Sequence, residues 1–478
     1  MKNNQNTENS TSFWWSMVSL GMFTFMSTLD GSIVNIALPV LSKQLDIPMN
    51  EATWTVSIYL IGISGLLTFF GNLGDQIGKI KVFRWGTVIF TIGSLLAGIN
   101  QGLYFLLAAR FVQAVGAAMT MSNSFGITTA LAPEHMRARA MAFISAFVSL
   151  GSITGPSLGG IILQNFSWSY IFWINVPLGI IAIVIGKFCF PKSATRDEKL
   201  VIDWIGAITL FVFVVAVFVG LNIAQVSGFS NVWTILFIVG GIASFVGFIY
   251  QELHTPKPLL NLSIFKSKLF SISVVAATLV FTTTAFINTL LPFYLEDLRA
   301  IPAGSAGLYM LFWPIAMLLF APVSGVVADK FDRENVTLFG LTMIMISLFT
   351  WIFVDAHTPM YFVAALLAFS GAGMAFFQTP NNALIMSNAP KKLLGVAGSV
   401  NALARNLGII IGTTLVTSVL YVAMSNYIGY HITSYPKNNP SIFVDGMHVS
   451  FIVAGVIVVI TFGLTLYRVI MRIKANNK

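Results

Sequence analysis

The chain has 478 residues, of which 56% are hydrophobic and only 9% are charged, and its mean hydropathy is +0.84. This composition excludes a soluble globular protein, whose surface needs many more charged residues. The formal net charge of +9 could indicate a nucleic-acid partner, but the distribution of the charges gives another reason for it. The single cysteine excludes an intramolecular disulfide and any site built from several cysteine ligands.

Apolar stretches of the length that crosses a bilayer as a helix, about 20 residues, recur along the whole chain. The first is longer than the apolar core of a signal peptide and no small-residue cleavage pattern follows it, so we expect it to span the membrane. The sequence therefore predicts an all-α integral membrane protein with fourteen spanning helices, near residues 13–38, 51–73, 82–100, 103–128, 138–163, 169–190, 202–222, 232–251, 270–294, 305–328, 336–355, 360–384, 394–423 and 448–470.

The basic residues lie mainly on one side of these predicted spans. If the amino terminus is placed inside the cell, only Lys43, Arg299 and Lys437 of the 26 Lys and Arg residues fall outside, and Arg110 and Arg405 lie within spans. This bias follows the positive-inside rule, and an even number of spans puts both termini in the cytoplasm. The basic charge thus reports membrane topology, with the lipid bilayer and no nucleic acid as partner.

The sequence motif in the loop between the second and third predicted spans is repeated eight spans later. Residues 71–81 read GNLGDQIGKIK and residues 325–335 read GVVADKFDREN, each with an Asp four residues after a Gly and basic residues behind it. Two six-helix halves would put the copies six spans apart, so we expect an inserted hairpin between them. The predicted domains are a six-helix bundle over 1–195, a linker with the hairpin over 196–256, and a second six-helix bundle over 257–478.

The two copies also supply candidate gating residues. A carboxylate beside basic residues at a helix end can hold two helices together in one conformation and release them in another, although a solvated loop charge is the simpler alternative. The second copy is less complete, because Asp332 stands where the first copy has a glycine. The candidates are Gly71, Asp75, Gly78, Lys79, Asp329 and Arg333.

Three charged residues fall inside the predicted spans and well away from the span ends. Asp30 is the only carboxylate near the middle of a span, and an ionisable group in a membrane is a functional candidate by default. We predict that it couples transport to protons or another cation; the alternative is an acid that caps or kinks the helix. Arg110 and Arg405 cannot lose their charge and therefore need partners or a solvated cavity. Arg405 either lines a cavity or pairs with neighbouring helices.

Polar, aromatic and methionine residues near these charges are candidates for a substrate cavity. Phe23 and Met26 precede Asp30 by seven and four residues and therefore share its helix face, as Asn401 and Arg405 share another. A surface of this kind can repack around dissimilar ligands, although each residue taken singly is as well explained by packing. The predicted cavity residues are Phe23, Met26, Asn35, Gln113, Asn288, Trp313, Phe377, Gln378, Asn382, Asn401 and Arg405.

Glycines and a proline interrupt the fifth predicted span. Glycines four residues apart let another helix approach backbone to backbone, and a proline bends the helix. A helix of this kind suits a protein whose halves rock against each other, and a static packing seam is the alternative. The residues are Gly151, Gly155, Pro156, Gly159 and Gly160.

Motifs of known enzymes are missing from the sequence. It has no GxxxxGK[ST] phosphate loop and no HExxH or GxSxG motif, and its five histidines are dispersed. We therefore predict that the chain is not an enzyme, that it has no metal site or cofactor, and that it draws energy from a proton gradient or another gradient.

Seven local motifs together resemble the fourteen-span drug:proton antiporters of the major facilitator superfamily, over nearly the full chain. One of them departs from the pattern, because Lys79 and Ile80 replace the usual Arg-Lys pair. The motifs lie at residues 29–39, 71–81, 109–118, 151–160, 168–179, 201–206 and 258–265.

This resemblance implies two parallel six-helix halves with a substrate site between them, and it puts Arg110 near the first helix, where it could pair with Asp30. It implies proton-coupled export of amphipathic drugs from a bacterial cell by a monomer in the plasma membrane. Some relatives carry a further acid in the tenth helix, associated with divalent cations. Here that helix has no carboxylate before Asp329, which favours substrates other than dications. A metabolite, nucleotide or lipid exporter, a receptor without transport activity and a membrane enzyme remain alternatives.

Overall fold

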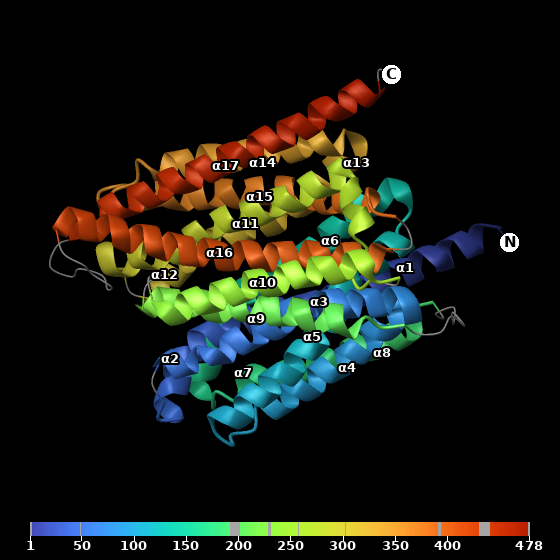
Figure 1. The fold of residues 1–478 in the computed structure, drawn as a ribbon, viewed down its shortest axis with the longest axis horizontal. Coiled ribbons are helices and arrows are strands. Elements are labelled where there is room, and N and C mark those ends of the chain that lie inside the picture. Colours follow the sequence, from blue (N-terminus) through green and yellow to red (C-terminus); the bar gives the residue numbers. More distant parts are fainter. Residues whose placement is uncertain are drawn as a thin grey trace. The chain divides into compact units, whose positions relative to one another are not determined.

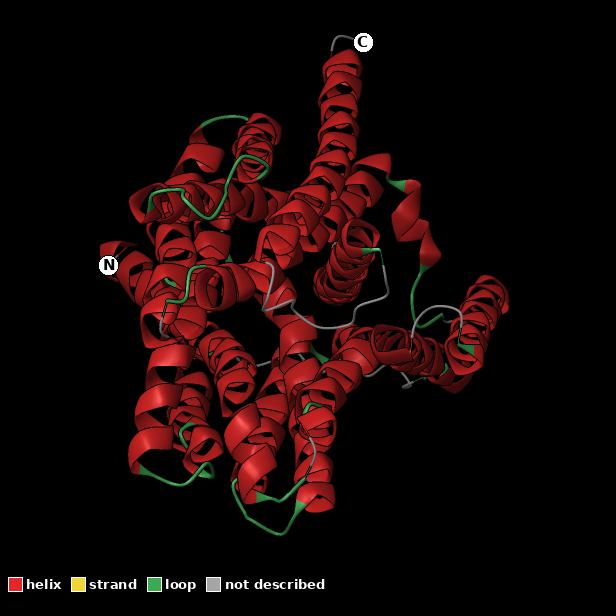
Figure 2. Cartoon of the chain, turned by 90° about the vertical axis from the view of Figure 1, so that its left-hand side faces the viewer, coloured by secondary structure: helices red, strands yellow, loops and turns green. Residues whose placement is uncertain are grey.

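The computed structural model describes residues 2–47, 49–191, 201–227, 231–256, 258–301, 303–390, 393–429 and 440–476. These residues form helices joined by loops, with no strand among them (Figure 2). Fourteen helical segments are long and apolar enough to cross a membrane, which confirms the predicted number and the all-α fold.

The helices divide into two compact units, each of which is described separately. Unit 1 comprises Met1–Phe218, Phe237–Lys266 and Met386–Leu403. Its core is formed where α1 packs on α6 and where α5 packs on α3 and α4 (Figure 1). Its helices are α1 (Lys2–Gln44), α2 (Met49–Ala52), α3 (Trp54–Ile77), α4 (Lys79–Ala97), α5 (Leu103–Leu131), η1 (Glu134–Met136), α6 (Arg137–Asn165), α7 (Tyr170–Trp173), α8 (Asn175–Cys189) and η2 (Leu262–Lys266).

Unit 2 comprises Val219–Leu236, Ser267–Ile385 and Ala404–Lys478. Here α17 packs against both α11 and α14. Its helices are α11 (Lys268–Pro292), a π-helical turn η3 (Phe293–Leu298), α12 (Ala303–Met310), α13 (Phe312–Lys330), α14 (Arg333–Trp351), α15 (Met360–Ser387) and α17 (Pro440–Asn476). Four helices have residues in both units: α9 (Trp204–Ser227), α10 (Val232–His254), α15, whose last two residues belong to unit 1, and α16 (Leu394–Ile428).

These units differ from the predicted domain boundaries at two places. Most of the predicted hairpin, α9 and α10, groups with unit 1, because Phe211 of α9 lies against Gly65 of α3 and Trp204 lies against Phe69. The first three turns of α16 group with unit 1 as well. Most of the predicted linker, residues 192–200, lies outside the described residues.

Glycines bring the third and fourth spans into backbone contact, and the eleventh and twelfth spans meet in the same way. A Cβ on Gly116 of α5 would lie 2.7 Å from the carbonyl oxygen of Gly86 on α4. A Cβ on Gly340 of α14 would lie 2.8 Å from the carbonyl oxygen of Gly373 on α15. The spacing of eight spans between these helix pairs equals that of the two repeated loop motifs, so the internal repeat extends to helix packing.

The glycines of the fifth span face α1. A Cβ on Gly151 would lie 2.7 Å from the carbonyl oxygen of Phe25, and one on Gly155 would overlap the Ser32 hydroxyl. Gly159 faces Ile33 in the same way, whereas nothing lies within 4 Å of the Cβ position of Gly160. The close helix contact predicted from the glycine spacing is therefore present at three of the four glycines. The side chain of Pro156 lies outside the described residues.

Replacing Gly155 by Leu should impair transport far more than replacing Gly160 by Leu. The first side chain would enter the contact between α6 and α1, where overpacking costs about 1–3 kcal/mol, and the second would enter open space. The initial rate of transport in vesicles, normalised to the amount of folded protein, measures the effect. Equal rates for the two variants would show that the α1–α6 contact is not needed for the transport cycle.

Candidate functional site: a buried ion pair in unit 1

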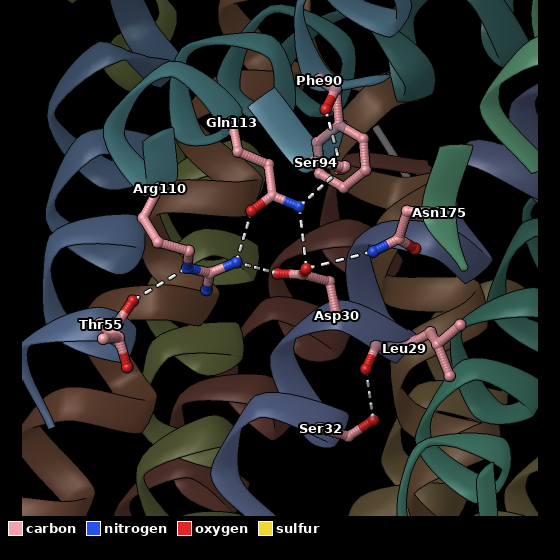
Figure 3. Close-up of polar contacts among 9 residues, drawn as sticks. All are labelled: Leu29, Asp30, Ser32, Thr55, Phe90, Ser94, Arg110, Gln113 and Asn175. Atoms are coloured by element: carbon pink, nitrogen blue, oxygen red, sulfur yellow. Dashed lines mark hydrogen bonds and ion pairs between the residues drawn. The ribbon is translucent and has the colours of Figure 1, made fainter. Parts of the chain in front are cut away.

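Asp30 of α1 is completely buried and accepts hydrogen bonds from three side chains (Figure 3). Its Oδ2 accepts a hydrogen bond from Nη1 of Arg110 at 2.5 Å, and the two side chains form an ion pair. Its Oδ1 receives Nε2 of Gln113 at 2.8 Å and Nδ2 of Asn175 at 3.2 Å. The expected pairing of Asp30 with Arg110 is thus found in the structure, with two amides completing the shell of the carboxylate.

Arg110 of α5 is also completely buried, and most of its partners are neutral. Its Nε donates to the carbonyl oxygen of Thr55 at 3.0 Å, and its Nη1 also donates to Oε1 of Gln113 at 2.5 Å. The guanidinium carbon lies 4.2 Å from the ring centroid of Tyr59, the geometry of a cation–π contact. The Phe172 ring lies 5.4 Å from the same carbon, so Asp30 is only one of five groups that stabilise the charge of Arg110.

Helix α4 packs against Gln113 and fixes the position of its side chain. A Cβ on Gly93 would lie 2.5 Å from the backbone nitrogen of Gln113, so the two helices can approach this closely only at a glycine. Nε2 of Gln113 donates to the hydroxyl of Ser94 at 2.8 Å, and that hydroxyl donates to the carbonyl oxygen of Phe90 at 2.9 Å (Figure 3). The amide that bridges the ion pair is thus fixed by packing and by hydrogen bonds.

The cluster has hydrogen-bond partners for both protonation states of Asp30. When Asp30 is ionised, it accepts three donors. When it is protonated, Arg110 keeps the Thr55 carbonyl, the Gln113 amide oxygen and the Tyr59 ring. Oδ1 of Asn175 is buried and has no donor among the described residues, so it can accept the new carboxylic acid proton if the amide turns over; Nη2 of Arg110 likewise has no acceptor among them. A change of one proton can therefore rearrange the site without leaving a bare charge.

The ion pair lies level with the beginning of α3, since Thr55 is the second residue of that helix. From the apolar pattern of the sequence, Asp30 is predicted to lie near the middle of the first span. In the structure α1 continues to Gln44, well beyond the apolar stretch Phe13–Val34, and Asp30 lies in the last turns of that stretch.

At the other end of α3, Asp75 caps the first turn of α16. Its Oδ1 accepts the backbone N–H of Gly395 and its Oδ2 that of Val396, both at 3.0 Å, and it forms an ion pair with Lys79. A carboxylate at a helix N-terminus satisfies free N–H groups and interacts favourably with the helix dipole. The structure therefore gives Asp75 a contact between helices, as the gating hypothesis requires, and not a solvated position.

Two glycines allow this contact to be close. A Cβ on Gly71 would lie 2.8 Å from the carbonyl oxygen of Gly395, and a Cβ on Gly395 would lie 2.6 Å from the carbonyl oxygen of Gly71. Gly78 separates α3 from α4 with φ of 104°, a backbone conformation that a side chain would strain. All four predicted gating residues of the first motif copy thus contribute to the junction of α3, α4 and α16.

The second copy of the motif forms a different set of contacts in unit 2. Asp329 and Arg333 make an ion pair of 3.6 Å one turn apart on the chain. Arg472 of α17 forms an ion pair with Asp332, the residue that replaces the glycine, and lies 3.9 Å from Glu334. The departure from the first copy thus corresponds to a bond between α14 and α17.

The predicted cavity residues near Asp30 are part of the apolar core of unit 1 in this conformation. Phe23 and Met26 are completely buried, and the Phe23 ring packs edge to face on Phe90 with 5.2 Å between centroids. The side chain of Asn35 lies outside the described residues. Their contact with a substrate stays a prediction that needs another conformation.

The predicted cavity residues of the later helices have varied surroundings. Trp313 lines a small cavity of about 10 Å³ in unit 2, together with Thr283, Ile287 and Met374. Asn288 is exposed and Arg405 is partly buried. The buried ones are Phe377, Gln378, Asn382 and Asn401.

Two buried polar residues were not identified from the sequence. Asn175, a member of the Asp30 cluster, lies within the motif at residues 168–179 but carries no charge that would single it out. Arg468 was counted with the basic residues of the cytoplasmic side, although it lies near the end of the predicted span 448–470. In the structure it is completely buried and donates Nη1 to the Ser273 hydroxyl at 2.6 Å and to Oδ1 of Asn381 at 3.1 Å.

Comparison with known families matches the Major Facilitator Superfamily model to residues 20–250 and 200–413. The chain belongs to this superfamily of membrane transporters, and fourteen segments of its described residues could span a membrane. It is 32% identical to the riboflavin transporter RibZ of Clostridioides difficile, over 85% of this chain and 88% of RibZ. It is 28% identical to the multidrug export protein EmrB of Escherichia coli K12, over 84% of this chain and 79% of EmrB.

Solved structures agree on the fold. The proton:xylose symporter XylE superposes with a TM-score of 0.66 at 14% identity, with 95% of each chain covered. The human organic anion transporter MFSD10 superposes with a TM-score of 0.60 at 15% identity, with 96% of this chain and 98% of that one covered.

Replacing Asp75 by Asn should loosen the contact between α3 and α16. The amide loses the ion pair with Lys79 and can accept at only one of its two atoms, and loss of a helix cap costs about 0.5–2 kcal/mol, roughly a 2- to 30-fold shift in an equilibrium. In a Cys189→Ser background, a Cys introduced at the buried Ser399 beside Gly71 should be alkylated faster when Asp75 is Asn. Asp46→Asn, an exposed site, is the control. Unchanged alkylation would contradict a gating role.

Proposed function

We propose that this chain is a proton-coupled secondary exporter of amphipathic small molecules, in which Asp30 is the coupling group. The observation that carries this proposal is the completely buried ion pair of Asp30 with Arg110, surrounded by partners that suit either protonation state. Multidrug export relatives such as EmrB support the substrate class. The proposed exchange needs no cofactor other than the proton gradient, and we propose that one chain suffices.

Proton uptake by Asp30 would change which partners stabilise Arg110 and would thereby favour one of two conformations. A transporter that alternates between inward- and outward-facing states needs only a few kcal/mol of such bias. Each elementary charge that crosses a potential of 100 mV contributes about 2.3 kcal/mol. One proton per cycle is therefore enough to drive uphill export of a neutral compound, whereas the exchange of one proton for a monocation moves no net charge and is driven by the pH gradient alone.

We propose a bacterial plasma membrane as the location, with both termini in the cytoplasm. The distribution of Lys and Arg over the loops supports this orientation. In everted vesicles the cytoplasmic face points outward, so export becomes accumulation in the lumen. The direct test measures how much of a fluorescent amphipathic cation accumulates in vesicles with an acidified lumen. The measurement is repeated after an ionophore has been added to collapse the pH gradient. Accumulation that does not respond to the collapse of the pH gradient would overturn proton coupling.

A second candidate is a transporter of riboflavin or a related planar compound. The relation to RibZ, at 32% identity over 85% of this chain, favours it. The ion pair of Asp30 and Arg110 can couple the transport of such a substrate to protons, or the substrate can move down its own concentration gradient without coupling. Parallel assays with labelled riboflavin and with the amphipathic cation separate the two candidates, because each predicts transport of only one of the two probes.

Asp30→Asn should abolish uphill export while exchange down a gradient persists. The amide keeps the shape and several hydrogen bonds of the carboxylate, but it cannot take up a proton and it leaves the charge of Arg110 without its ionic partner. Accumulation against a gradient in everted vesicles measures the loss. Asp46→Asn, which makes the same chemical change at an exposed position beyond the end of α1, should transport like the parent. Full uphill transport by Asp30→Asn would make Asp30 a structural residue.

Dications should be poorer substrates than monocations, zwitterions or neutral compounds. The Asp30 cluster is electrically balanced, and α13 supplies no carboxylate before Asp329. A second positive charge would therefore be moved into a site without a matching anion. Competition between a monocationic dye and the dication pentamidine measures the preference. Robust export of pentamidine that depends on Asp30 would contradict it.

A further inference from the structure

Two acidic residues lie together at the base of the inserted hairpin, away from the Asp30 cluster. Asp203 directly precedes α9 and is 8% exposed, and Glu252 lies near the end of α10 and is 4% exposed. Both belong to unit 1. The proposed transport mechanism uses neither of them.

One oxygen of each carboxyl group has hydrogen-bond donors. Oδ1 of Asp203 accepts the backbone N–H of Gly206 at 2.9 Å and Nε2 of Gln251 at 3.1 Å. Oε2 of Glu252 accepts the backbone N–H of Leu260 at 2.9 Å. The other two oxygens, Oδ2 of Asp203 and Oε1 of Glu252, are buried and have no partner among the described residues. A buried acceptor without a donor is costly, and these are two in one place.

The two unpartnered oxygens face the same point. A Cβ on Gly206 would lie 2.6 Å from Oε1 of Glu252 and 2.9 Å from Oδ2 of Asp203. The absent side chain of Gly206 thus leaves room for both oxygens to turn toward each other. Two carboxylates in one buried site cannot both stay ionised, whereas a single proton shared between them supplies the missing donor and removes the repulsion.

Among the described residues, no cationic side chain pairs with either acid. On α10 the neighbouring side chains are Gln251, a neutral amide, and His254, whose Nδ1 is 2.7 Å from the carbonyl oxygen of Tyr250. On α3 the side chains that reach this segment are the neutral amides of Asn72 and Gln76. Neither acid of the pair forms an ion pair among the described residues. A proton held between the two oxygens would supply the donor that both of them lack.

The same two amides of α3 hold the chain on both sides of the hairpin. Gln76 exchanges two hydrogen bonds with the backbone of Val201, at 3.0 and 3.1 Å. Asn72 donates to the carbonyl oxygens of Pro258 and Leu259, at 3.2 and 2.9 Å, and the Gln76 amide donates to Oδ1 of Asn72 at 2.6 Å. Asp75, which caps α16, lies between these two amides on α3. The state of the carboxyl pair is thus connected to the helix that carries the gating residues.

We propose that Asp203 and Glu252 form a second proton-binding site, which holds one proton between the two carboxyl groups and keeps the base of the hairpin fastened to α3. With the proton bound, the pair carries one negative charge and the bond from Leu260 to Glu252 is kept. Loss of the proton creates two adjacent negative charges, and in this proposal their repulsion pushes α10 away from α9 by more than the ionised Glu252 gains as a hydrogen-bond acceptor for Leu260. The fastened state is therefore favoured at low pH and is lost as the pH rises.

Infrared spectra of the full-length protein in nanodiscs, recorded from about pH 5 to about pH 9, test for the shared proton. We expect a protonated-carboxyl band that is absent from both Glu252→Gln and Asp203→Asn and present in Asp30→Asn. Glu296→Gln, an exposed glutamate, is the control and should keep the band. Identical spectra for the parent and for both pair variants would overturn the proposal. So would a band that appears only after sodium and magnesium ions are removed, because the site would then bind a metal cation.

Hydrogen exchange of the segment around Leu260 tests the fastening. After correction for the intrinsic exchange rate, protection in the parent should fall as the pH rises. In Glu252→Gln it should stay constant, because the amide oxygen can accept from Leu260 and the amide nitrogen can donate to Asp203 at any pH. The same pH dependence in parent and variant would overturn the connection to the hairpin. Neither experiment uses transport, so failure of the export proposal would leave these outcomes unchanged.

Discussion

A charge that is buried away from water needs an opposite charge or several hydrogen bonds, and in this chain Asp30 and Arg110 impose that requirement on the whole of unit 1. Five helices each supply something to the pair. α1 and α5 carry the two charges, α3 gives the Thr55 carbonyl, α4 gives the hydroxyl of Ser94 behind the bridging amide, and α8 gives Asn175. Removing one member of such a pair typically costs about 3–5 kcal/mol, so the helices around it are held to one arrangement in each protonation state.

Helices can converge in this way only if some of them touch through their backbones. Gly93 is such a place, because a methyl group there would meet the backbone of Gln113 and push the bridging amide away from the carboxylate. The α1–α6 contact at Gly151 and Gly155 uses the same device for a different purpose. There the Ser32 hydroxyl donates to the carbonyl oxygen of Gly151 at 3.3 Å, which joins α6 to the helix that carries Asp30.

The number of spans could be predicted because each apolar stretch has the length that crosses a bilayer. The class of protein and the pairing of Asp30 with Arg110 followed from the resemblance of the sequence motifs to a known family. Asp30 and Arg110 are conspicuous for being charged in an apolar stretch. Asn175 is not conspicuous, and its bond to Asp30 joins residues 145 positions apart, which only the fold reveals. The helical period already places Gly160 off the face of Gly151 and Gly155, and the structure has it in open space.

Phe23 and Met26 show the limit of the argument from helical faces. Their spacing correctly puts them on the face of Asp30, but α1 is covered on most sides, so sharing that face does not distinguish a cavity from a core. The pair Asp203 and Glu252 was missed for a similar reason. Each is a single acid near the end of an apolar stretch, where charges are common, and nothing in the sequence says that the two ends of the hairpin meet.

Helix α3 connects these separate features. Near its first residue, the Thr55 carbonyl accepts from Arg110; near its last, Asn72 and Gln76 hold the hairpin and Asp75 holds α16. About 25 Å of regular helix lies between the two ends, at 1.5 Å per residue, and a helix of that length moves as a rod. In the two proposals, a proton at Asp30 changes the hydrogen bond of Arg110 to Thr55, and a proton shared by Asp203 and Glu252 acts at the other end of the same helix. If both sites bias the position of α3 in this way, proton binding at either one has to alter the affinity at the other by the same factor.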